Sequence, residues 1–299
     1  MNDAHLRLSY LGETVRALYP GPGSPRPYSV LPHRLLPRRL APRRWWHPGR
    51  RITVPVAGSI ETYLSEVFGA PVETVLHVRP ARRANRKPVL EAYTGGTRLA
   101  YVKVGDTPRA RGLVDAEAAA LRRLGDLALK TVVAPSVLHH GRWGGFAVLA
   151  LSPLPVRRGP VPAALLAEAV KEIAGTGGAG GPAWHGDLSP WNISPSRDGR
   201  LLAWDWERYE VGVPYGFDAV HHFLQRALRR MDPRTAAQAC LAQAVPVLAP
   251  LGLSAAQARR TALRYLIALA DRHAADGHEP LGPPDAWLNP LVDHQESLT

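Results

Sequence analysis

The stretch 184–218 constrains this 299-residue chain more than any other part of it. It contains Trp-His-Gly-Asp-Leu-Ser-Pro-Trp-Asn near its start and Trp-Asp-Trp-Glu in its middle. Four residues separate Asp187 from Asn192, and Asp205 follows thirteen residues after Asn192. One carboxylate can orient a hydroxyl group, while a second carboxylate and an amide supply oxygen ligands for Mg²⁺. The spacing therefore predicts a polar loop that handles a magnesium-bound phosphate compound.

Composition indicates a globular chain. Hydrophobic residues make up 45% of it, which is enough for a sizeable core. Cys240 is the only cysteine, so neither a disulfide framework nor a cysteine-based zinc site forms within one chain. No run of eighteen apolar residues occurs, and the first residues lack a signal pattern. We expect no membrane span and a cytoplasmic location.

The positive charge is concentrated near the N-terminus. Residues 1–51 carry ten arginines against Asp3 and Glu13, a net +8 out of +12 for the chain. Eight prolines between positions 20 and 48 exclude a long helix there. This segment has two interpretations. It is a basic arm that binds phosphates or an anionic surface, or it is an extended strap that packs on the domain behind it. We favour the strap, because Trp45 and Trp46 are side chains that usually become buried.

Periodicity predicts a β-rich region followed by a helical one. A short helix at 59–69 begins at the N-cap Ser59 and ends at Gly69. The further expected elements are strands at 72–78, 89–94 and 97–104, a helix at 109–124, strands at 134–143 and 145–151, and helices at 161–174, 218–231, 234–248 and 254–275. Gly95-Gly96 predicts a hairpin turn.

The order of these elements predicts an α+β fold with two lobes. The expected division is a Pro/Arg-rich N-terminal extension at 1–58, a sheet-containing N-lobe at 59–152, and a mainly helical C-lobe at 153–299. The C-lobe would contain the polar loop around Asp187 and Asn192.

The sequence from His185 to Asn192, followed by Asp205-Trp206-Glu207, resembles the aminoglycoside phosphotransferase family. That family also holds choline kinase-like enzymes and belongs to the protein kinase-like superfamily. Its loop reads His-Gly-Asp-x-x-x-x-Asn, and a later triplet carries a second metal-binding Asp. The resemblance extends from about residue 70 to about residue 275 and implies a two-lobed protein kinase-like fold.

The resemblance implies a role for each loop residue. Asp187 would be the catalytic residue that accepts or orients the proton of the substrate hydroxyl, and Asn192 and Asp205 would hold Mg²⁺. His185 would brace Asp187 within the loop. Asp218 would tie the loop to the following helix through backbone N–H groups.

Lys103 and Glu117, which lie earlier in the chain, complete the expected nucleotide site. Lys103 would contact the α- and β-phosphates, and Glu117 would hold Lys103 through an ion pair, with Asp115 as a competing partner. The cofactors would be ATP and Mg²⁺. Tyr101, two residues before Lys103, would shape the base pocket, so GTP stays open as the nucleotide.

No glycine-rich phosphate loop is present. The segment at the corresponding place, 80–88, is basic and free of glycine. Phosphates would then be contacted by side chains, with Arg82, Arg83, Arg86 and Lys87 as the candidates.

The expected acceptor is a small molecule. The helices after Asp218 are rich in arginine and poor in acids, which favours a sugar, nucleoside or glycan precursor over a polycationic aminoglycoside. The alternatives are an aminoglycoside-modifying kinase and a catalytically idle kinase-like binding or regulatory module. Nucleic-acid binding through the basic arm is disfavoured, because no readout motif accompanies it. The oligomeric state stays open.

Several aromatic and histidine residues have two interpretations. The tryptophans around the loop either stack on a substrate ring or pack the large lobe, and we favour packing. The pairs His139-His140 and His221-His222 lack zinc-ligand spacing, so we expect ordinary surface and core histidines.

Overall fold

The computed structural model describes residues 3–21, 25–33, 35–78, 86–157, 159–275 and 281–289. The chain forms two compact units. The sheet unit comprises residues 1–118 and 136–153, and the helical unit comprises residues 119–135 and 154–299.

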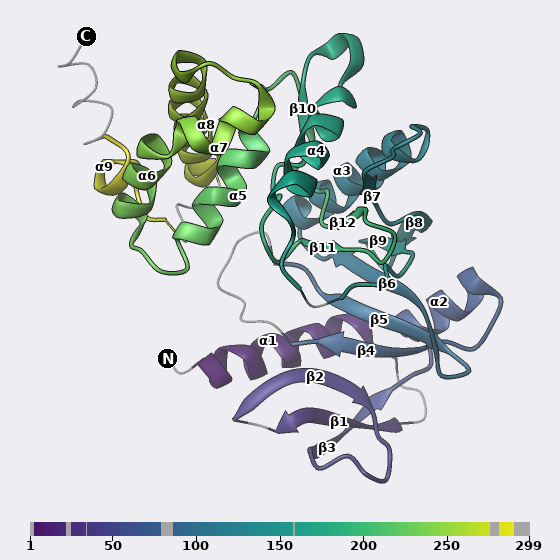
Figure 1. The fold of residues 1–299 in the computed structure, drawn as a ribbon. Coiled ribbons are helices and arrows are strands. Elements are labelled where there is room, and N and C mark those ends of the chain that lie inside the picture. Colours follow the sequence, from purple (N-terminus) through teal and green to yellow (C-terminus); the bar gives the residue numbers. More distant parts are fainter. Residues whose placement is uncertain are drawn as a thin grey trace. The chain divides into compact units, whose positions relative to one another are not determined.

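The sheet unit is built on eight antiparallel strands in the order β3-β1-β2-β4-β5-β6-β9-β8 (Figure 1). The strands are β1 (Pro25–His33), β2 (Leu36–Pro42), β3 (Arg50–Pro55), β4 (Glu73–His77), β5 (Val89–Thr94), β6 (Thr97–Gly105), β8 (Val137–Trp143) and β9 (Phe146–Leu151). Its helices are α1 (Asp3–Leu18), α2 (Ile60–Phe68) and the first part of α3 (Pro108–Gly125).

One face of the sheet carries the core of this unit. Leu18 of α1 and Leu64 of α2 are fully buried in one cluster with Leu90 and Val102 from the sheet. Successive side chains of a strand point to opposite faces, so Lys103 lies on the other face of β6 from Val102. The packing of α1 and α2 thus leaves the Lys103 face to other partners.

Local sequence signals explain the ends of several elements. Ser59 accepts a hydrogen bond from the backbone N–H of Glu61, and Gly69 ends α2 with φ = 64°. The turn between β5 and β6 has φ = 54° at Gly95 and 82° at Gly96, the geometry that favours glycine in a two-residue hairpin. The predictions of α2 and of this hairpin are confirmed.

The N-terminal segment contains more regular structure than its proline content predicts. Residues 25–55 supply β1, β2 and β3 of the eight-stranded sheet. Pro32 lies where the pairing of β1 with β2 shifts by a bulge, a place where a strand tolerates proline. The expected burial of the two tryptophans is wrong, since Trp45 is 90% and Trp46 61% exposed. Both lie in the loop between β2 and β3, outside the paired strands of the sheet. The division at residues 58 and 152 stays a prediction.

The helical unit carries most of the helices. They are α4 (Ala163–Gly175), α5 (Phe217–Ala227), α6 (Pro233–Ala242), α7 (Ala244–Leu248), α8 (Ala255–Ala275) and α9 (Pro284–Trp287). Five short strands accompany them: β7 (Val132–Val133), β10 (Ala183–Trp184), β11 (Ile193–Pro195), β12 (Leu201–Ala203) and β13 (Glu210–Val211). The helix expected at 234–248 is divided at Gln243 into α6 and α7.

An antiparallel sheet unit and a mainly helical unit confirm the predicted α+β class. In the described part of the chain, no helix has the length and apolar content that crossing a membrane requires.

Candidate functional site

The loop 185–192 lies in the helical unit between β10 and β11 and is anchored on α5. Asp218, in the first turn of α5, accepts hydrogen bonds from the backbone N–H groups of His185 (2.7 Å) and Gly186 (3.4 Å). Burial raises the pKa of Asp218 to about 7, although these two bonds act in the opposite direction. The imidazole of His185 accepts a hydrogen bond from the N–H of Asp187 at Nδ1 (3.2 Å). Burial lowers the pKa of His185 to about 4, so its ring is neutral near pH 7.

Three side chains on one face of α5 contact the loop. His221 and His222 lie three and four residues after Asp218, which places each of them beside Asp218 on the helix. His222 donates through Nδ1 to the carbonyl oxygen of Leu188 (3.0 Å), and its pKa is lowered to about 4, mainly by burial. Sequence reasoning treated His221 and His222 as ordinary histidines. Their i+3 and i+4 spacing from Asp218 was the signal that links them to the loop.

The carboxylate of Asp187 is held from two sides. Its Oδ1 accepts hydrogen bonds from the hydroxyl of Ser189 and from Nε2 of His221, the latter at 2.9 Å. Burial acts to raise the pKa of Asp187, but the bonds from His221 and Ser189 outweigh it and lower that pKa to about 2. One third (33%) of the Asp187 side chain is exposed. The carboxylate is thus ionised, oriented and open to a ligand.

A buried tyrosine fixes the protonation of His221. The hydroxyl of Tyr265, on α8, lies 2.8 Å from Nδ1 of His221. Burial raises the pKa of Tyr265 well above its usual value, so the hydroxyl keeps its proton and donates to Nδ1. Burial also lowers the pKa of His221. The neutral ring then carries its proton on Nε2 and donates it to Asp187. Sequence reasoning did not find Tyr265, which lies 44 residues from His221.

Asn192 closes the loop. Its Nδ2 donates to the carbonyl oxygen of Asp187 (3.0 Å), which leaves Oδ1 as the amide atom suited to a metal. The carbonyl of Asn192 accepts from the N–H of Trp204 (3.1 Å), so Asp205 is the next residue along the chain from this contact. Asp205 has φ = 73°, and it is the one non-glycine residue with positive φ in the described part of the chain. Such strained backbone is concentrated at functional sites.

Gly186 allows a close approach of the backbone at the loop. It has φ = 82°, and a Cβ there would lie 2.0 Å from the carbonyl oxygen of Arg208. Its own carbonyl oxygen accepts a 2.6 Å hydrogen bond from Nη1 of Arg272. The guanidinium of Arg272 also lies 5.2 Å from the ring centroid of Trp184. Arg272 is a further contact to the loop that sequence reasoning did not assign.

The sheet unit brings together the other two predicted residues. Nζ of Lys103, on β6, lies 2.6 Å and 2.5 Å from the two carboxylate oxygens of Glu117, on α3. Both side chains are buried. The competing residue Asp115 instead pairs with His140 (2.8 Å) and Arg142 (2.7 Å). Lys103 and Glu117 belong to the sheet unit, and the loop 185–192 belongs to the helical unit.

The remaining candidates for the nucleotide lie on or near β6. Tyr101 shares the face of Lys103, and its hydroxyl accepts from Nη1 of Arg98 at 2.8 Å. Arg86 pairs with Glu13 (3.2 Å). Arg82 and Arg83 lie outside the described residues.

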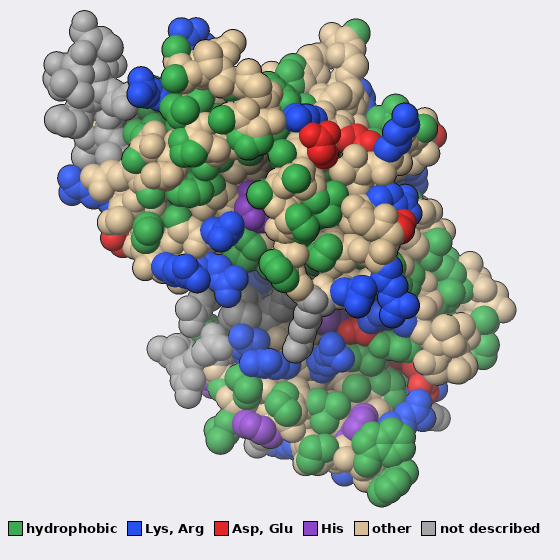
Figure 2. All heavy atoms as spheres, viewed as in Figure 1, with side chains coloured by type: hydrophobic (Ala, Val, Ile, Leu, Met, Phe, Trp, Pro, Cys, Tyr) green, Lys and Arg blue, Asp and Glu red, His purple; other side chains and the backbone are tan. Residues whose placement is uncertain are grey.

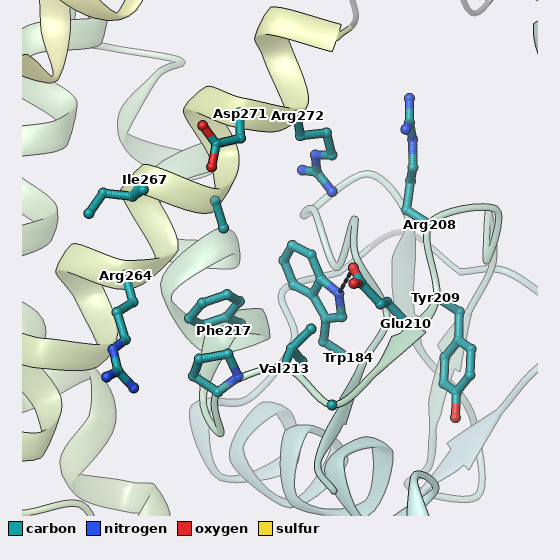
Figure 3. A pocket seen from close by; sticks show the side chains of 13 residues that line it. Trp184, Arg208, Tyr209, Glu210, Val213, Phe217, Arg264, Ile267, Asp271 and Arg272 are labelled. Carbon is teal, nitrogen blue, oxygen red and sulfur yellow. Dashed lines mark hydrogen bonds between the residues drawn. The ribbon is translucent and has the colours of Figure 1, made fainter. Parts of the chain in front are cut away.

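A pocket of about 690 Å³ lies in the helical unit close to the loop (Figure 3). Trp184 and Phe217 form an aromatic wall, and Nε1 of Trp184 donates to Glu210 at 3.4 Å. Figure 3 shows Arg264, Ile267, Asp271 and Arg272 along the α8 side. Arg208 is the third arginine of the lining. Three arginines against two carboxylates make this lining net positive.

The tryptophans near the loop divide between core and surface. Trp184 is 5% and Trp206 0% exposed, as the packing interpretation expects, whereas Trp191 is 50% exposed.

Comparisons with known proteins give similar solved structures only. No protein-family model and no curated protein sequence matches the chain. A protein of Haemophilus somnus 129PT assigned as a fructosamine-3-kinase has 13% identity and a TM-score of 0.45, over 72% of this chain and 90% of that one. An aminoglycoside phosphotransferase of Alicyclobacillus acidocaldarius has 13% identity and a TM-score of 0.35, over 65% and 89%. The bifunctional kinase-methyltransferase WbdD has 14% identity and a TM-score of 0.36, over 59% of this chain and 42% of WbdD. At such identities and scores, a likeness decides neither family nor activity nor substrate.

Proposed function

We propose that this protein is an ATP-dependent phosphotransferase that moves the γ-phosphate to a hydroxyl group of a small molecule. The observation that carries the proposal is the Asp187 carboxylate, ionised and held on Oδ1 by Ser189 and His221 while its side chain remains one-third exposed. Phosphoryl transfer asks the protein mainly for such positioning and for electrostatic stabilisation.

The low pKa of Asp187 limits what this residue does. A carboxylate with a pKa of about 2 is a weak base near pH 7. It therefore orients the acceptor hydroxyl toward the phosphate and takes the proton only late in the reaction. A loose transition state with little bonding to the nucleophile is compatible with that order.

The residues around the loop suit a magnesium ion. Asn192 offers an amide oxygen and Asp205 a carboxylate, the hard oxygen ligands that Mg²⁺ prefers. When bound, the ion would neutralise charge on the β- and γ-phosphates. His185 and Asp218 keep the loop in shape, because both contact backbone N–H groups within it.

Lys103 would contact the α- and β-phosphates of the nucleotide. Glu117 fixes its ammonium group through two short contacts, which removes the rotational freedom of a long side chain. Tyr101 lies on the same strand face and would border the base, so ATP and GTP turnover should be compared directly.

The acceptor would be neutral or anionic. The pocket beside the loop combines an aromatic wall of Trp184 and Phe217 with Arg264 and Arg272 on α8. Such walls stack on sugar or base rings, and arginines bind phosphate or carboxylate groups. This lining favours a sugar, a nucleoside or a glycan precursor over a polycationic aminoglycoside.

A nucleotide-consumption screen tests the proposal. Sugars, sugar phosphates, nucleosides and aminoglycosides are offered with ATP or GTP and Mg²⁺. The variant D187N should abolish acceptor-dependent turnover. The matched control D198N changes an exposed turn aspartate of the same unit and should keep it.

The alternative is a kinase-like module that binds nucleotide without transferring phosphate. Nucleotide binding by wild-type protein, without turnover above D187N on any acceptor, would favour that module. Turnover on aminoglycosides alone would keep the enzyme but contradict the assigned acceptor class.

A further inference from the structure

The loop between β2 and β3 exposes two neighbouring indole rings. Trp45 is 90% and Trp46 61% exposed, the largest exposed fractions of any described tryptophan. The two rings are perpendicular, with centroids 5.5 Å apart. Two adjacent exposed tryptophans are unusual, because burying such rings is strongly favourable. They therefore indicate a surface that is covered by a partner.

The strands that flank this loop carry only positive charge. Residues 25–55 contain eight arginines and no Asp or Glu; one of them, Arg34, lies outside the described residues. Arg50 and Arg51, at the start of β3, are exposed immediately after the loop. On the face shown in Figure 2, the lower part of the sheet unit shows basic and hydrophobic side chains with few acidic ones.

The base of the loop is held in place. Arg43 donates through Nη1 to Ser29 Oγ (3.2 Å) and to the carbonyl oxygen of Gly49 (3.1 Å). Arg44 pairs with Glu73 on the neighbouring strand β4 at 2.9 Å. A braced loop presents its tip without an ordering cost when a partner binds.

We propose that the loop 43–49 docks on a membrane surface that carries anionic phospholipids. Tryptophan rings prefer the headgroup level of a bilayer, where an apolar body and an N–H group are both accommodated. Arginines beside them are attracted by the negative surface potential, which acts within about 10 Å at moderate salt. The combination of an aromatic tip and arginine flanks matches this partner in both shape and charge. The protein would bind peripherally through this loop.

A single-stranded nucleic acid fits the same charge less well. Such ligands use aromatic side chains as platforms on which successive bases stack. Perpendicular rings do not offer two parallel platforms in sequence, whereas both can enter a headgroup layer together.

Vesicle co-sedimentation of the full chain tests this proposal. The wild-type protein should bind vesicles of phosphatidylcholine mixed with phosphatidylglycerol. It should bind much more weakly to vesicles of phosphatidylcholine alone. The variant R50Q/R51Q should lower the partition coefficient by about 30-fold at low salt, because each of the two arginines contributes about fivefold through its attraction to an anionic surface. The variant W45S/W46S should lower it roughly tenfold or more, because the buried apolar area is lost.

A matched control separates this effect from net charge. The variant R229Q/R230Q removes two adjacent, exposed arginines in the turn that follows α5 in the helical unit and should bind as the wild type does. Equal binding of R50Q/R51Q and the wild type, equal loss in both arginine variants, or unchanged binding of W45S/W46S would each overturn the proposal.

Fluorescence anisotropy with oligo(dT) tests whether the loop binds single-stranded nucleic acid instead of a membrane. Binding of oligo(dT) that both loop variants abolish, without any binding to anionic vesicles, would assign the loop to nucleic acid and refute the membrane partner. All variants change exposed side chains, so melting temperatures near that of the wild type are the folding control.

Discussion

Replacing His221 by leucine tests the hydrogen-bonded chain from Tyr265 to Asp187. The variant removes the Nε2 donor to the Asp187 carboxylate and the Nδ1 acceptor of the Tyr265 hydroxyl. His221 is 1% and Tyr265 0% exposed, so water cannot replace either contact without rearrangement.

The size of the effect follows from these two losses. A hydrogen bond to a charged group contributes about 1.5–3 kcal/mol, and an orphaned buried hydroxyl costs about 1–3 kcal/mol. We expect H221L to lower the free energy of unfolding by roughly 3–5 kcal/mol. Urea titration followed by tryptophan fluorescence measures it.

A double-mutant cycle with Y265F isolates the contact between the two rings. Once the hydroxyl is absent, H221L no longer leaves it unsatisfied. The loss caused by H221L should therefore be about 1–2 kcal/mol smaller in the Y265F background. A loss of stability below about 1 kcal/mol in H221L, or full additivity with Y265F, would refute the hydrogen-bonded series from Tyr265 through His221 to Asp187.

Catalysis gives an independent readout of the same variant. Without the donor on Oδ1, the carboxylate of Asp187 is less well oriented, and misplacement of a catalytic group costs up to about 100-fold. The kcat should fall while the KM for ATP stays near the wild-type value. Because the bond from His221 lowers the pKa of Asp187, the acidic limb of the pH–rate profile should move to higher pH in H221L.

Three further predictions concern other contacts. E117Q should lower the free energy of unfolding by about 3–5 kcal/mol in urea titration, because it leaves the Lys103 charge buried. The double variant K103M/E117L should be more stable than E117Q. The reverse order of stability would show that the pair is solvated. G186A should lower the melting temperature and abolish turnover, because its Cβ would meet the Arg208 carbonyl at 2.0 Å and φ is 82°; a variant with wild-type activity would contradict this. The pKa of Asp218 in the folded state, about 7, lies above its usual value of 3.8. Between these two values the folded state keeps a proton on Asp218 that the unfolded state has lost. The free energy of unfolding should therefore fall as pH rises from about 4 to about 7. D218N should lack this fall, and parallel pH profiles of the two proteins would contradict the raised pKa.

Local signals predicted many elements of this fold. Ser59, Gly69 and Gly95-Gly96 act within a few residues of themselves, so the ends of α2 and the β5–β6 hairpin can be derived without tertiary information. The strands in residues 25–55 could not be predicted in this way. Their prolines and arginines oppose strand formation locally, and pairing with β4 and within the sheet outweighs that preference.

The sequence by itself determined which residue types surround the loop: Asp187, Asn192 and Asp205 at fixed spacings and Asp218 on the following helix. Only the tertiary structure decided what holds Asp187. Tyr265 lies far along the chain on α8, and its contact with His221 depends on how α5 and α8 pack, which no local pattern specifies. The same holds for Trp45 and Trp46, because exposure depends on what a folded chain places around a side chain and not on the side chain's own preference for burial.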